Sequence, residues 1–463
     1  MLDEAIAKIR EVFSGSPFEG KLYLVGGLIR DRLLGVPPEQ DIDLVCLCDA
    51  LEAARWLRDT GVADHSPVVY PRFGTAMVTV LGVQVELATA RRESYAPGSR
   101  KPERVEPATL EEDVLRRDFT VNTLVEDLFT GERLDLTGRA LPDLEARLIR
   151  TPLEPRETFN DDPLRMLRAV RFAARLDFEI EQDTWSAIRE CAARLEIVSR
   201  ERIRDELTRT LMLAPGRASR GLGLMLESGL LRQFAPELAE MAGVQQNVFH
   251  LYDVWTHTLK AIESLPEDSS LDERLAMLLH DVGKPRTRSV DASGGVHFYG
   301  HQQVGAEMAR DLLQRLKFPN QTVTRVTRLV ERHMRIGEYS DEWSDSAVRR
   351  LIRDLGDDLD SLFTIAEADR AACNPEYHYL DPARVRVRIR QVQEEADYAR
   401  VQSPLDGVEI MRIAGLRPGP DVGRLKDYLV NEILEGRLAE GDRQAAERLL
   451  REKLEAEHGR QRS

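Results

Sequence analysis

The chain has 463 residues, more than one hydrophobic core usually holds, so we expect about three or four domains. Its net charge of −15 excludes a protein that coats nucleic acid by general attraction, because such binding needs many cations against the phosphates. Charged residues, 31% of the chain, interrupt every long apolar run, which excludes a membrane-spanning stretch of about 20 apolar residues. A nucleic-acid partner would therefore bind at a local basic patch.

The first predicted element is an amphipathic helix from Met1 to Phe13, which lacks the basic start and apolar centre of a signal peptide. We therefore expect a cytoplasmic protein with no membrane partner. Its four cysteines form neither a CxxC pair nor a disulfide framework, so buried reduced thiols are expected. Up to about residue 150, short β-rich runs alternate with helical stretches and predict an α/β or α+β unit. The predicted strands are Leu22–Val25, Ile42–Leu47, Ala76–Leu81 and Val83–Leu87, and a predicted helix covers Leu51–Asp59.

A Gly-Gly pair stands where the first strand turns into a helix that begins near Leu28. Gly26 and Gly27 lack side chains, so backbone N–H groups could approach a triphosphate there, with Arg30 as an added cation. The chain contains no GxxxxGK motif, which excludes a P-loop. An ordinary tight turn is the alternative interpretation of this glycine pair.

Two aspartates follow in the next predicted strand, one residue apart in "DIDLVCL". Because alternate residues of a strand point to the same side, Asp41 and Asp43 aim their carboxylates together while Ile42 turns into the core. A divalent cation would stabilise this repelling pair, and carboxylates together with substrate phosphates favour Mg²⁺. Glu86, in a second predicted strand, is the candidate third carboxylate of a two-metal site. The alternative is a turn residue at Asp41 and a solvated strand position at Asp43.

From about Asp161 onward the periodicity is almost wholly helical, so the remainder of the chain is predicted to be all-α. In "DDPLRMLRAVRFAARL", residues 161–176, Pro163 starts a helix and arginines recur at three- and four-residue spacing. Asp162 and Arg165 are expected on one face, where a fixed Asp–Arg pair offers acceptors and donors that match the edges of cytosine or adenine. A solvated arginine-rich face with an acidic N-terminal cap is the alternative.

Histidines and aspartates recur in the second half of the chain in an order that predicts a metal site. A His-Asp doublet ends an apolar helix in "LAMLLHDVGK", and the other members come from separate predicted helices. This nitrogen and oxygen set suits Mn²⁺, Ni²⁺ or Fe²⁺, which could activate water for attack on a phosphate ester. A lone histidine on an apolar helix is more often satisfied by a backbone carbonyl. The candidate ligands are His257, His280, Asp281, His301, His333 and Asp369.

Five ordered motifs in about the first 240 residues resemble class II tRNA nucleotidyltransferases and bacterial poly(A) polymerases. They are "LVGGLIRDRLLG", "DIDLV", "RRDFTVNTL" at 116–124, "DDPLRMLRAVRFAARL" and "SRERIRDEL" at 199–207. The resemblance implies an α+β fold, with a polymerase-β-like head of mixed sheet and helices followed by an all-α neck and body. The order of the histidines and aspartates resembles the HD phosphohydrolase superfamily and implies an all-α HD domain. The implied boundaries are 1–150 for the head, 151–245 for the neck and body, 246–372 for the HD domain and 373–463 for a helical C-terminal domain.

The resemblance also implies roles for single residues. Asp41 and Asp43 would be the Mg²⁺ ligands of nucleotidyl transfer, with Glu86 as the third catalytic carboxylate. The motif at 116–124 would contact the ribose and triphosphate, and the family's Glu-Asp-x-x-Arg motif, which here begins with Asp161, would select the base. The implied nucleotide-binding set is Gly26, Gly27, Arg30, Arg117, Asp118, Asn122, Asp161, Asp162, Arg165, Arg168 and Arg171.

The function that the resemblance implies is addition of CCA, or only the terminal A, to tRNA 3′ ends from CTP and ATP with Mg²⁺. The enzyme would bind the acceptor stem and the 3′ end of tRNA. The polar segment between Glu86 and Arg117 resembles the family's flexible loop, whose length favours A addition. A bacterial poly(A) polymerase, which shares these motifs, is one alternative. Another is an RNA-binding head that serves an HD phosphatase or phosphodiesterase; no oligomeric state is predicted.

Overall fold

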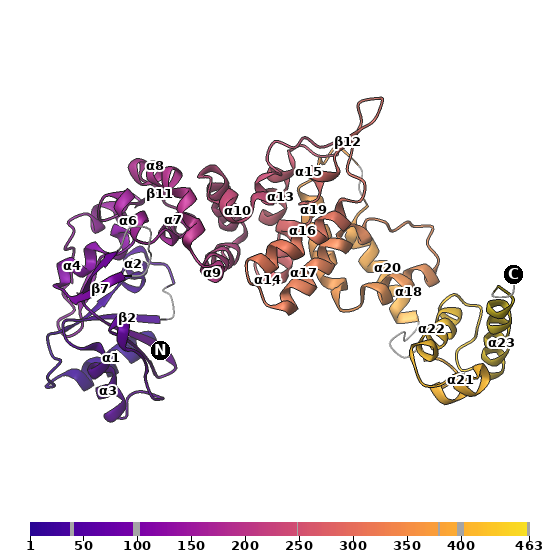
Figure 1. Cartoon of the computed structure of the whole chain (residues 1–463), viewed down its shortest axis with the longest axis horizontal. Helices are drawn as coiled ribbons and strands as arrows, with labels where there is room; N and C mark the ends of the chain where they lie inside the picture. The colour runs from indigo at the N-terminus through magenta and orange to yellow at the C-terminus, as the bar shows by residue number, and fades with distance from the viewer. Residues whose placement is uncertain (38–40, 96–101, 248, 378–379, 396–401, 461–463) are drawn as a thin grey trace.

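The structure is a computed structural model that describes residues 1–37, 41–95, 102–247, 249–377, 380–395 and 402–460. The chain runs from an N-terminal head through a helical neck and a larger helical unit to a small group of C-terminal helices at the opposite end (Figure 1). Buried apolar side chains form one large cluster between Ala5 and Val392, a separate one between Leu405 and Leu450, and a small one in the head between Val25 and Val125. No described helix is long and apolar enough to cross a membrane.

The head is built on a seven-stranded sheet with the order β3-β4-β5-β2-β1-β8-β9. β2 and β5 pair in parallel and the other neighbours are antiparallel, so the expected mixed sheet is confirmed. The four strands predicted from the sequence pattern correspond to β1, β2, β4 and β5. The strands are β1 (Leu22–Val25), β2 (Asp41–Cys46), β3 (Val68–Tyr70), β4 (Thr75–Val80), β5 (Val83–Thr89), β8 (Val125–Asp127) and β9 (Arg133–Leu134).

Helices α1 and α3 cover one face of this sheet, and the opposite face carries polar side chains along β5 and a small apolar cluster with Leu110 and Val114 of α4. Strand β5 buries Val83, Val85 and Leu87 and exposes Gln84 and Glu86 between them. Helix α3 contacts both β4 and β5, and the buried residues of these strands belong to the same core as those of α1 and α3. The head helices are α1 (Leu2–Phe13), α2 (Gly27–Leu34), α3 (Ala50–Asp59), α4 (Leu110–Leu115) and α5 (Ala140–Glu145), with 3₁₀ turns at Pro71–Phe73 and Thr120–Asn122.

The polar segment between Glu86 and Arg117 contains more regular structure than the loop that its composition indicates. β6 (Arg91–Tyr95) and β7 (Pro102–Pro107) form an antiparallel pair outside the main sheet. Such a ribbon satisfies backbone groups without needing an apolar face, so the hydrophobic pattern does not indicate it.

The neck is helical, as expected, apart from one short strand pairing between β10 (Leu148–Ile149) and β11 (Glu179–Ile180). Helix α7 begins directly after Pro163, buries Leu167 and Phe172 among its apolar residues, and packs on α9 and α10. The neck helices are α6 (Pro155–Asp161), α7 (Leu164–Leu176), α8 (Gln182–Cys191), α9 (Arg200–Leu211), α10 (Pro215–Glu227), α11 (Leu231–Phe234) and α12 (Pro236–Ala239), with a 3₁₀ turn at Ala192–Ile197.

The helices after the neck, from α13 to α20, form the third unit, which carries the predicted histidine ligands, and its core continues that of the neck. The last of them, α20, contacts α18 and α19 and buries Val385 and Ile389 in the same cluster. The separate C-terminal cluster begins only at Leu405, so the apolar contacts of α20 are with the third unit. The helices of the third unit are α13 (Val254–Glu263), α14 (Leu271–Leu279), α15 (Lys284–Thr287), α16 (His301–Arg315), α17 (Asn320–Arg332), α18 (Asp345–Leu355), α19 (Leu359–Ala371) and α20 (Pro382–Glu395), with a hairpin of β12 (Ser289–Val290) and β13 (Val296–His297) and 3₁₀ turns at His333–Ile336 and Gly356–Asp358. The C-terminal helices are α21 (Gly407–Ala414), α22 (Pro420–Leu434) and α23 (Arg443–Arg460).

Candidate functional site

The acidic residues of the head lie on the face of the sheet opposite the helical core. Asp43 of β2 pairs directly with Glu86 of β5, and Asp41, two residues earlier, projects from the same face. Asp41 and Glu86 are exposed, Asp43 is half-buried, and Ile42 is buried on the other face. All three acidic side chains offer carboxylate oxygens, which fit an ion such as Mg²⁺. The described residues contain groups of three possible metal ligands whose atoms lie within 4.8 Å of one another, and all of these groups are in the second half of the chain. The carboxylates of Asp41, Asp43 and Glu86 are therefore farther apart than that.

The glycine turn after β1 brings a cation close to this acidic face. Gly26 has a φ of 80°, and a Cβ there would lie 3.3 Å from an Asp43 carboxylate oxygen and 3.9 Å from an Arg117 guanidinium nitrogen. Gly27 is the first residue of α2, whose first N–H groups have no partner within the helix. Backbone donors, an arginine and a carboxylate are therefore adjacent, as a triphosphate site requires.

The sequence predicted that Arg30 adds a cation at this turn, but its side chain points elsewhere. Its side chain is fully buried, donates to Asn122 Oδ1, and donates from Nε to Asp31 at 2.8 Å. The guanidinium group also lies 5.0 Å from the ring centre of Phe172 in α7. Helix α2 directs this position towards the neck, so Arg30 holds Asn122 in place and is not an exposed cation.

The carboxylate of Asp118 is held by several donors from the head and the neck. Its Oδ1 accepts from the backbone N–H of Phe119 and from Asn122 Nδ2, each at 2.9 Å. Its Oδ2 accepts from Arg168 Nε at 2.8 Å and lies 2.6 Å from a second nitrogen of that guanidinium. Burial acts to raise the pKa of Asp118, but Arg168 and the Asn122 hydrogen bond outweigh it and lower the pKa to about 2. Asp118 is therefore a charged acceptor in a fixed position.

This network continues into α9 through Glu206, which our sequence reasoning did not single out. Glu206 is buried, accepts from Arg171 Nε at 2.7 Å, and lies 3.9 Å from Arg168. These two arginines and Arg30 all lie over the ring of Phe172, at 4.4 to 5.3 Å from its centre. In the sequence, the one feature that could have indicated Glu206 was its position in the motif at 199–207. Buried charges and one aromatic ring thus join the head to the neck.

Asp162 and Arg165 were expected to lie together as the base-reading pair, and their side chains have different polar partners. Arg202 of α9 binds Asp162 through two nitrogens, at 2.7 and 3.2 Å. Arg165 donates instead to the backbone carbonyls of Arg116 and Thr158. Asp162 lies in the break between α6 and α7 with an extended backbone, and its carbonyl accepts from the Arg165 N–H at 3.0 Å, so the three-residue spacing places the two residues side by side. Asp161, the last residue of α6, is half-buried next to it.

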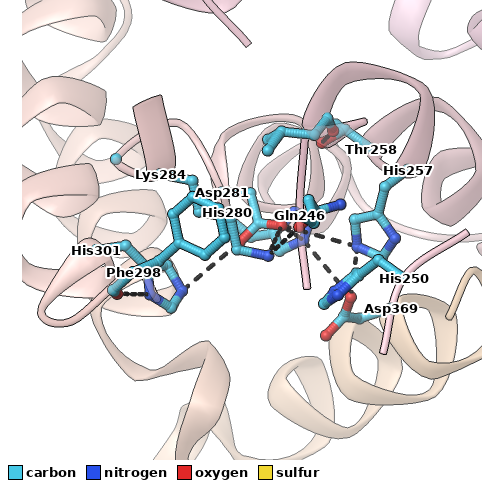
Figure 2. Close-up of polar contacts among 12 residues, drawn as sticks. Gln246, His250, His257, Thr258, His280, Asp281, Lys284, Phe298, His301 and Asp369 are labelled. Carbon is cyan, nitrogen blue, oxygen red and sulfur yellow. Dashed lines mark hydrogen bonds and ion pairs between the residues drawn. The ribbon is translucent and has the colours of Figure 1, made fainter. Parts of the chain in front are cut away.

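The six predicted ligands of the second half come together from distant parts of the chain, and Figure 2 shows the side chains of five of them, His257, His280, Asp281, His301 and Asp369, close together. The ligand atoms of His257, His280 and Asp369 lie within 4.8 Å of one another. The same holds for a second group made of Asp281, His301 and His333. His257 Nε2 lies 2.8 Å from Asp369, and Asp281 lies between the groups, 3.1 Å from His280 Nε2 and 3.6 Å from His301 Nε2.

Backbone carbonyls orient three of these histidines. The Nδ1 atoms of His280, His301 and His333 lie 2.6 to 2.9 Å from the carbonyl oxygens three residues before them, which leaves each Nε2 directed at the cluster. His280 Nε2 is buried and makes no hydrogen bond within the described residues, although Asp281 lies nearby. An imidazole and carboxylate set with such an orphaned nitrogen fits a divalent transition metal.

The charges in this cluster favour a cation. Burial acts to raise the pKa of Asp281, but His280 and Lys284 outweigh it and lower the pKa well below its usual range. Burial acts to lower the pKa of His280, yet Asp281 and Asp369 raise it to about 10. Burial and the neighbouring imidazoles of His280 and His301 lower the pKa of His333 to about 3. The two carboxylates are thus negatively charged at neutral pH.

A cavity of about 590 Å³ opens onto this cluster. Lys284 lines it, lies 2.7 Å from Asp281 Oδ2 and donates to Gln246 at 2.7 Å. His250, which sequence reasoning left out, also lines it, with its ring centre 4.8 Å from that of His257. Only Lys284 had a sequence signal, as the last residue of "HDVGK". The cavity can therefore hold a ligand that contacts both ligand groups and a lysine.

Three family models match successive parts of the chain. Residues 22–150 match "Poly A polymerase head domain", residues 177–241 match "Probable RNA and SrmB- binding site of polymerase A", and residues 248–372 match "HD domain". Together with the mixed sheet and its acidic face, these matches define a nucleotidyltransferase with an HD domain in the same chain.

Curated relatives match most of the chain. The CC-adding tRNA nucleotidyltransferase of Thermus thermophilus is 38% identical, over 90% of this chain and 90% of the relative. The A-adding tRNA nucleotidyltransferase of Deinococcus radiodurans is 38% identical over 69% of this chain and 74% of the relative. The CCA-adding enzyme of Enterococcus faecalis is 30% identical over 94% and 92%. The chain therefore belongs to the tRNA nucleotidyltransferase family, which includes the CCA-adding enzymes.

Solved structures show the same fold along nearly the whole chain. The Bacillus stearothermophilus CCA-adding enzyme in complex with CTP gives a TM-score of 0.69 at 22% identity, over 99% of this chain and 98% of that one. The Thermotoga maritima CCA-adding enzyme complexed with tRNA gives 0.58 at 20% identity, over 97% and 95%. At these identities the likeness concerns the fold alone.

Proposed function

We propose that this protein completes tRNA 3′ ends by adding CCA, or only the terminal A, from CTP and ATP. The observation that carries the proposal is the direct pairing of Asp43 with Glu86, beside Gly26 and Arg117, on one face of the head sheet. Bound by Asp41, Asp43 and Glu86, Mg²⁺ would neutralise the triphosphate and activate the RNA 3′-hydroxyl. The names of the curated relatives support tRNA as the RNA that is extended.

The incoming nucleotide would lie between the head sheet and α7. Arg117, beside the glycine turn, would bind the triphosphate. Asp118, fixed by Asn122 and Arg168, would accept a hydrogen bond from the ribose 2′-hydroxyl and so favour ribonucleotides. The side chains of Arg30 and Arg171 are buried, so they would position neighbouring residues and not contact the nucleotide.

The base would be read at the break between α6 and α7. Asp162 offers carboxylate acceptors there, and Arg202 holds it in a forked arrangement with donors at its edge. Arg165, anchored on the carbonyls of Arg116 and Thr158, and the adjacent Asp161 complete this group. We propose that this cluster selects CTP and ATP in place of a template strand.

A CC-adding activity is the second candidate, because the Thermus thermophilus relative of that name matches 90% of this chain. The folded β6–β7 segment favours A addition instead, since it occupies the place of the family's flexible loop. A poly(A) polymerase would share the head and neck, and the model that matches residues 22–150 is described for that enzyme. Product length and primer choice separate these activities.

With CTP, ATP and Mg²⁺, the purified protein is expected to extend tRNA transcripts that lack CCA, or that end in CC, to the complete CCA end. Gel separation of the products formed with each single nucleotide and with both measures the activity. Products that stop at CC indicate the second candidate, and long A tails on unrelated RNA indicate a poly(A) polymerase. If no transcript is extended while a phosphate ester is hydrolysed, the result favours the other hypothesis, in which the head only binds RNA and the HD domain is the enzyme.

We also propose that the HD domain hydrolyses phosphate esters at RNA ends, such as terminal or 2′,3′-cyclic phosphates. Two adjacent ligand groups support it, since Asp281, His301, His333 and Asp369 line the cavity, and Mn²⁺, Ni²⁺ or Fe²⁺ bound there would supply activated water. Lys284, on the cavity wall beside Asp281, would bind a phosphate oxygen.

Asp281→Asn is expected to lower phosphate ester hydrolysis and metal content together, with hydrolysis falling at least about 100-fold. Asp281 belongs to one ligand group and lies 3.1 Å from the other, so its charge serves both. Nucleotide addition should be unchanged, because the acidic face of the head is separate. Asp311→Asn, an exposed change in α16, is the matched control. Hydrolysis and metal content equal to those of the unaltered protein would contradict the assignment.

A further inference from the structure

A small pocket lies on the sheet face that carries the acidic residues. It has a volume of about 250 Å³ and is lined by Tyr70, Phe73, Thr75, Met77, Glu86 and Arg91. Tyr70 and Phe73 keep 45% and 42% of their surfaces exposed, which is unusual for large side chains beside a sheet. Glu86 therefore belongs both to this pocket and to the acidic face.

The sheet register places this pocket relative to the catalytic face. Met77 of β4 pairs with Glu86, which pairs with Asp43 on its other side, and Asp43 pairs in turn with Val25. Neighbouring strands lie about 4.8 Å apart, so the pocket begins at Glu86, about 5 Å from Asp43, and Met77 lies roughly 10 Å from it. Gly26 follows Val25 on the opposite side of Asp43. The triphosphate turn and the aromatic pocket thus flank the acidic residues from two sides.

Nucleotidyl transfer needs two groups on opposite sides of the reacting phosphorus. The RNA 3′-oxygen loses its proton to water and bonds to the α-phosphorus, while the bond to the pyrophosphate oxygen breaks in line with it. The glycine turn, Arg117 and Asp118 occupy the side proposed for the nucleotide and its leaving group. The attacking strand must therefore approach from the Glu86 side, where the pocket lies.

We propose that this pocket binds the terminal nucleoside of the RNA being extended, with its base stacked on Tyr70 and Phe73. The inference deepens the proposed function and depends on it. Arg91 supports the aromatic wall, because its guanidinium donates to the Phe73 carbonyl and, at 3.2 Å, to Thr75 Oγ1. Stacking suits this subsite because the terminal base changes after each addition, and any base offers a stacking face.

The test compares two tRNA transcripts, one with an intact terminal nucleoside and one whose terminal residue lacks its base. The unaltered protein is expected to extend the intact end about 5- to 150-fold faster, the range that base–aromatic stacking gives. Tyr70→Leu/Phe73→Leu should extend both ends at similar rates, close to that of the abasic end in the unaltered protein. Its KM for CTP and ATP should be unchanged, and its melting temperature shows whether it folds.

Leu141→Ala, an exposed apolar change in α5 of the head, is the matched control and should retain the preference for the intact end. A double variant that still prefers the intact end would overturn the inference. A raised KM for the nucleotide with the preference intact would assign the pocket to the incoming base and also overturn it. If the unaltered protein extends neither transcript, the proposed function is contradicted. If it extends both transcripts at the same rate, only the inference about the pocket is contradicted.

Discussion

Asp43→Asn is expected to reduce nucleotide addition at least about 1,000-fold, because the loss of an ion ligand removes several kcal/mol of transition-state stabilisation. The amide keeps the size of the side chain and the pairing of β2 with β5, but it removes a negative charge between Asp41 and Glu86. The free energy of unfolding should therefore stay the same or rise slightly, since the carboxylates repel one another. Rates of single-nucleotide addition over a range of Mg²⁺ concentrations measure the effect.

The matched control is Asp59→Asn, an exposed aspartate at the end of α3 with a surface ion pair to Arg58. It should leave addition and stability unchanged. Hydrolysis by the HD domain should persist in both variants, which shows that the chain still folds. An Asp43→Asn protein that extends RNA at the unaltered rate would show that the acidic face does not hold the catalytic ions.

The acidic face of the head could be predicted from sequence because it depends on local geometry. The alternation of a strand places Asp41 and Asp43 on one side, and the apolar neighbours of Glu86 indicate that it faces the same way. The parallel pairing of β2 with β5, which brings Asp43 opposite Glu86, is a tertiary fact that no local pattern contains. The histidine cluster was likewise predictable from the order of its motifs, but not the way its ligand atoms group, nor the approach of His250 and Cys373 to His257.

The partners of the charged residues could not be predicted, because they lie far apart in the chain. The Asp162 carboxylate is bound by Arg202, a residue 40 positions later, although the backbone of Asp162 accepts from the nearby Arg165. Arg30 is buried because α2 packs towards Phe172 of the neck, which is 142 positions away by subtraction of the residue numbers. Periodicity indicates which residues are polar, but tertiary packing decides which polar residues meet.

Arg168→Met is expected to lower the free energy of unfolding by about 3 kcal/mol and to abolish nucleotide addition. The change leaves the Asp118 carboxylate, which is 8% exposed, without its guanidinium partner, and breaking a buried ion pair costs about 3 to 5 kcal/mol. We expect the lower end of this range of free energies, because 31% of the Arg168 side chain is exposed. Adding Asp118→Asn should restore most of the stability, since the buried charge at position 118 that lost its partner is then gone, but not the activity.

The same pair predicts how stability depends on pH. The folded pKa of Asp118 is about 2, below its ordinary value of 3.8, so its charge stabilises the folded protein above pH 4 and that contribution is lost as the pH falls through 2. The shift corresponds to about 2 kcal/mol. Urea unfolding between pH 6 and 2 should therefore show a smaller acid-induced loss of stability for Asp118→Asn than for the unaltered protein. Equal losses in both would mean that Arg168 does not hold the carboxylate in its charged form.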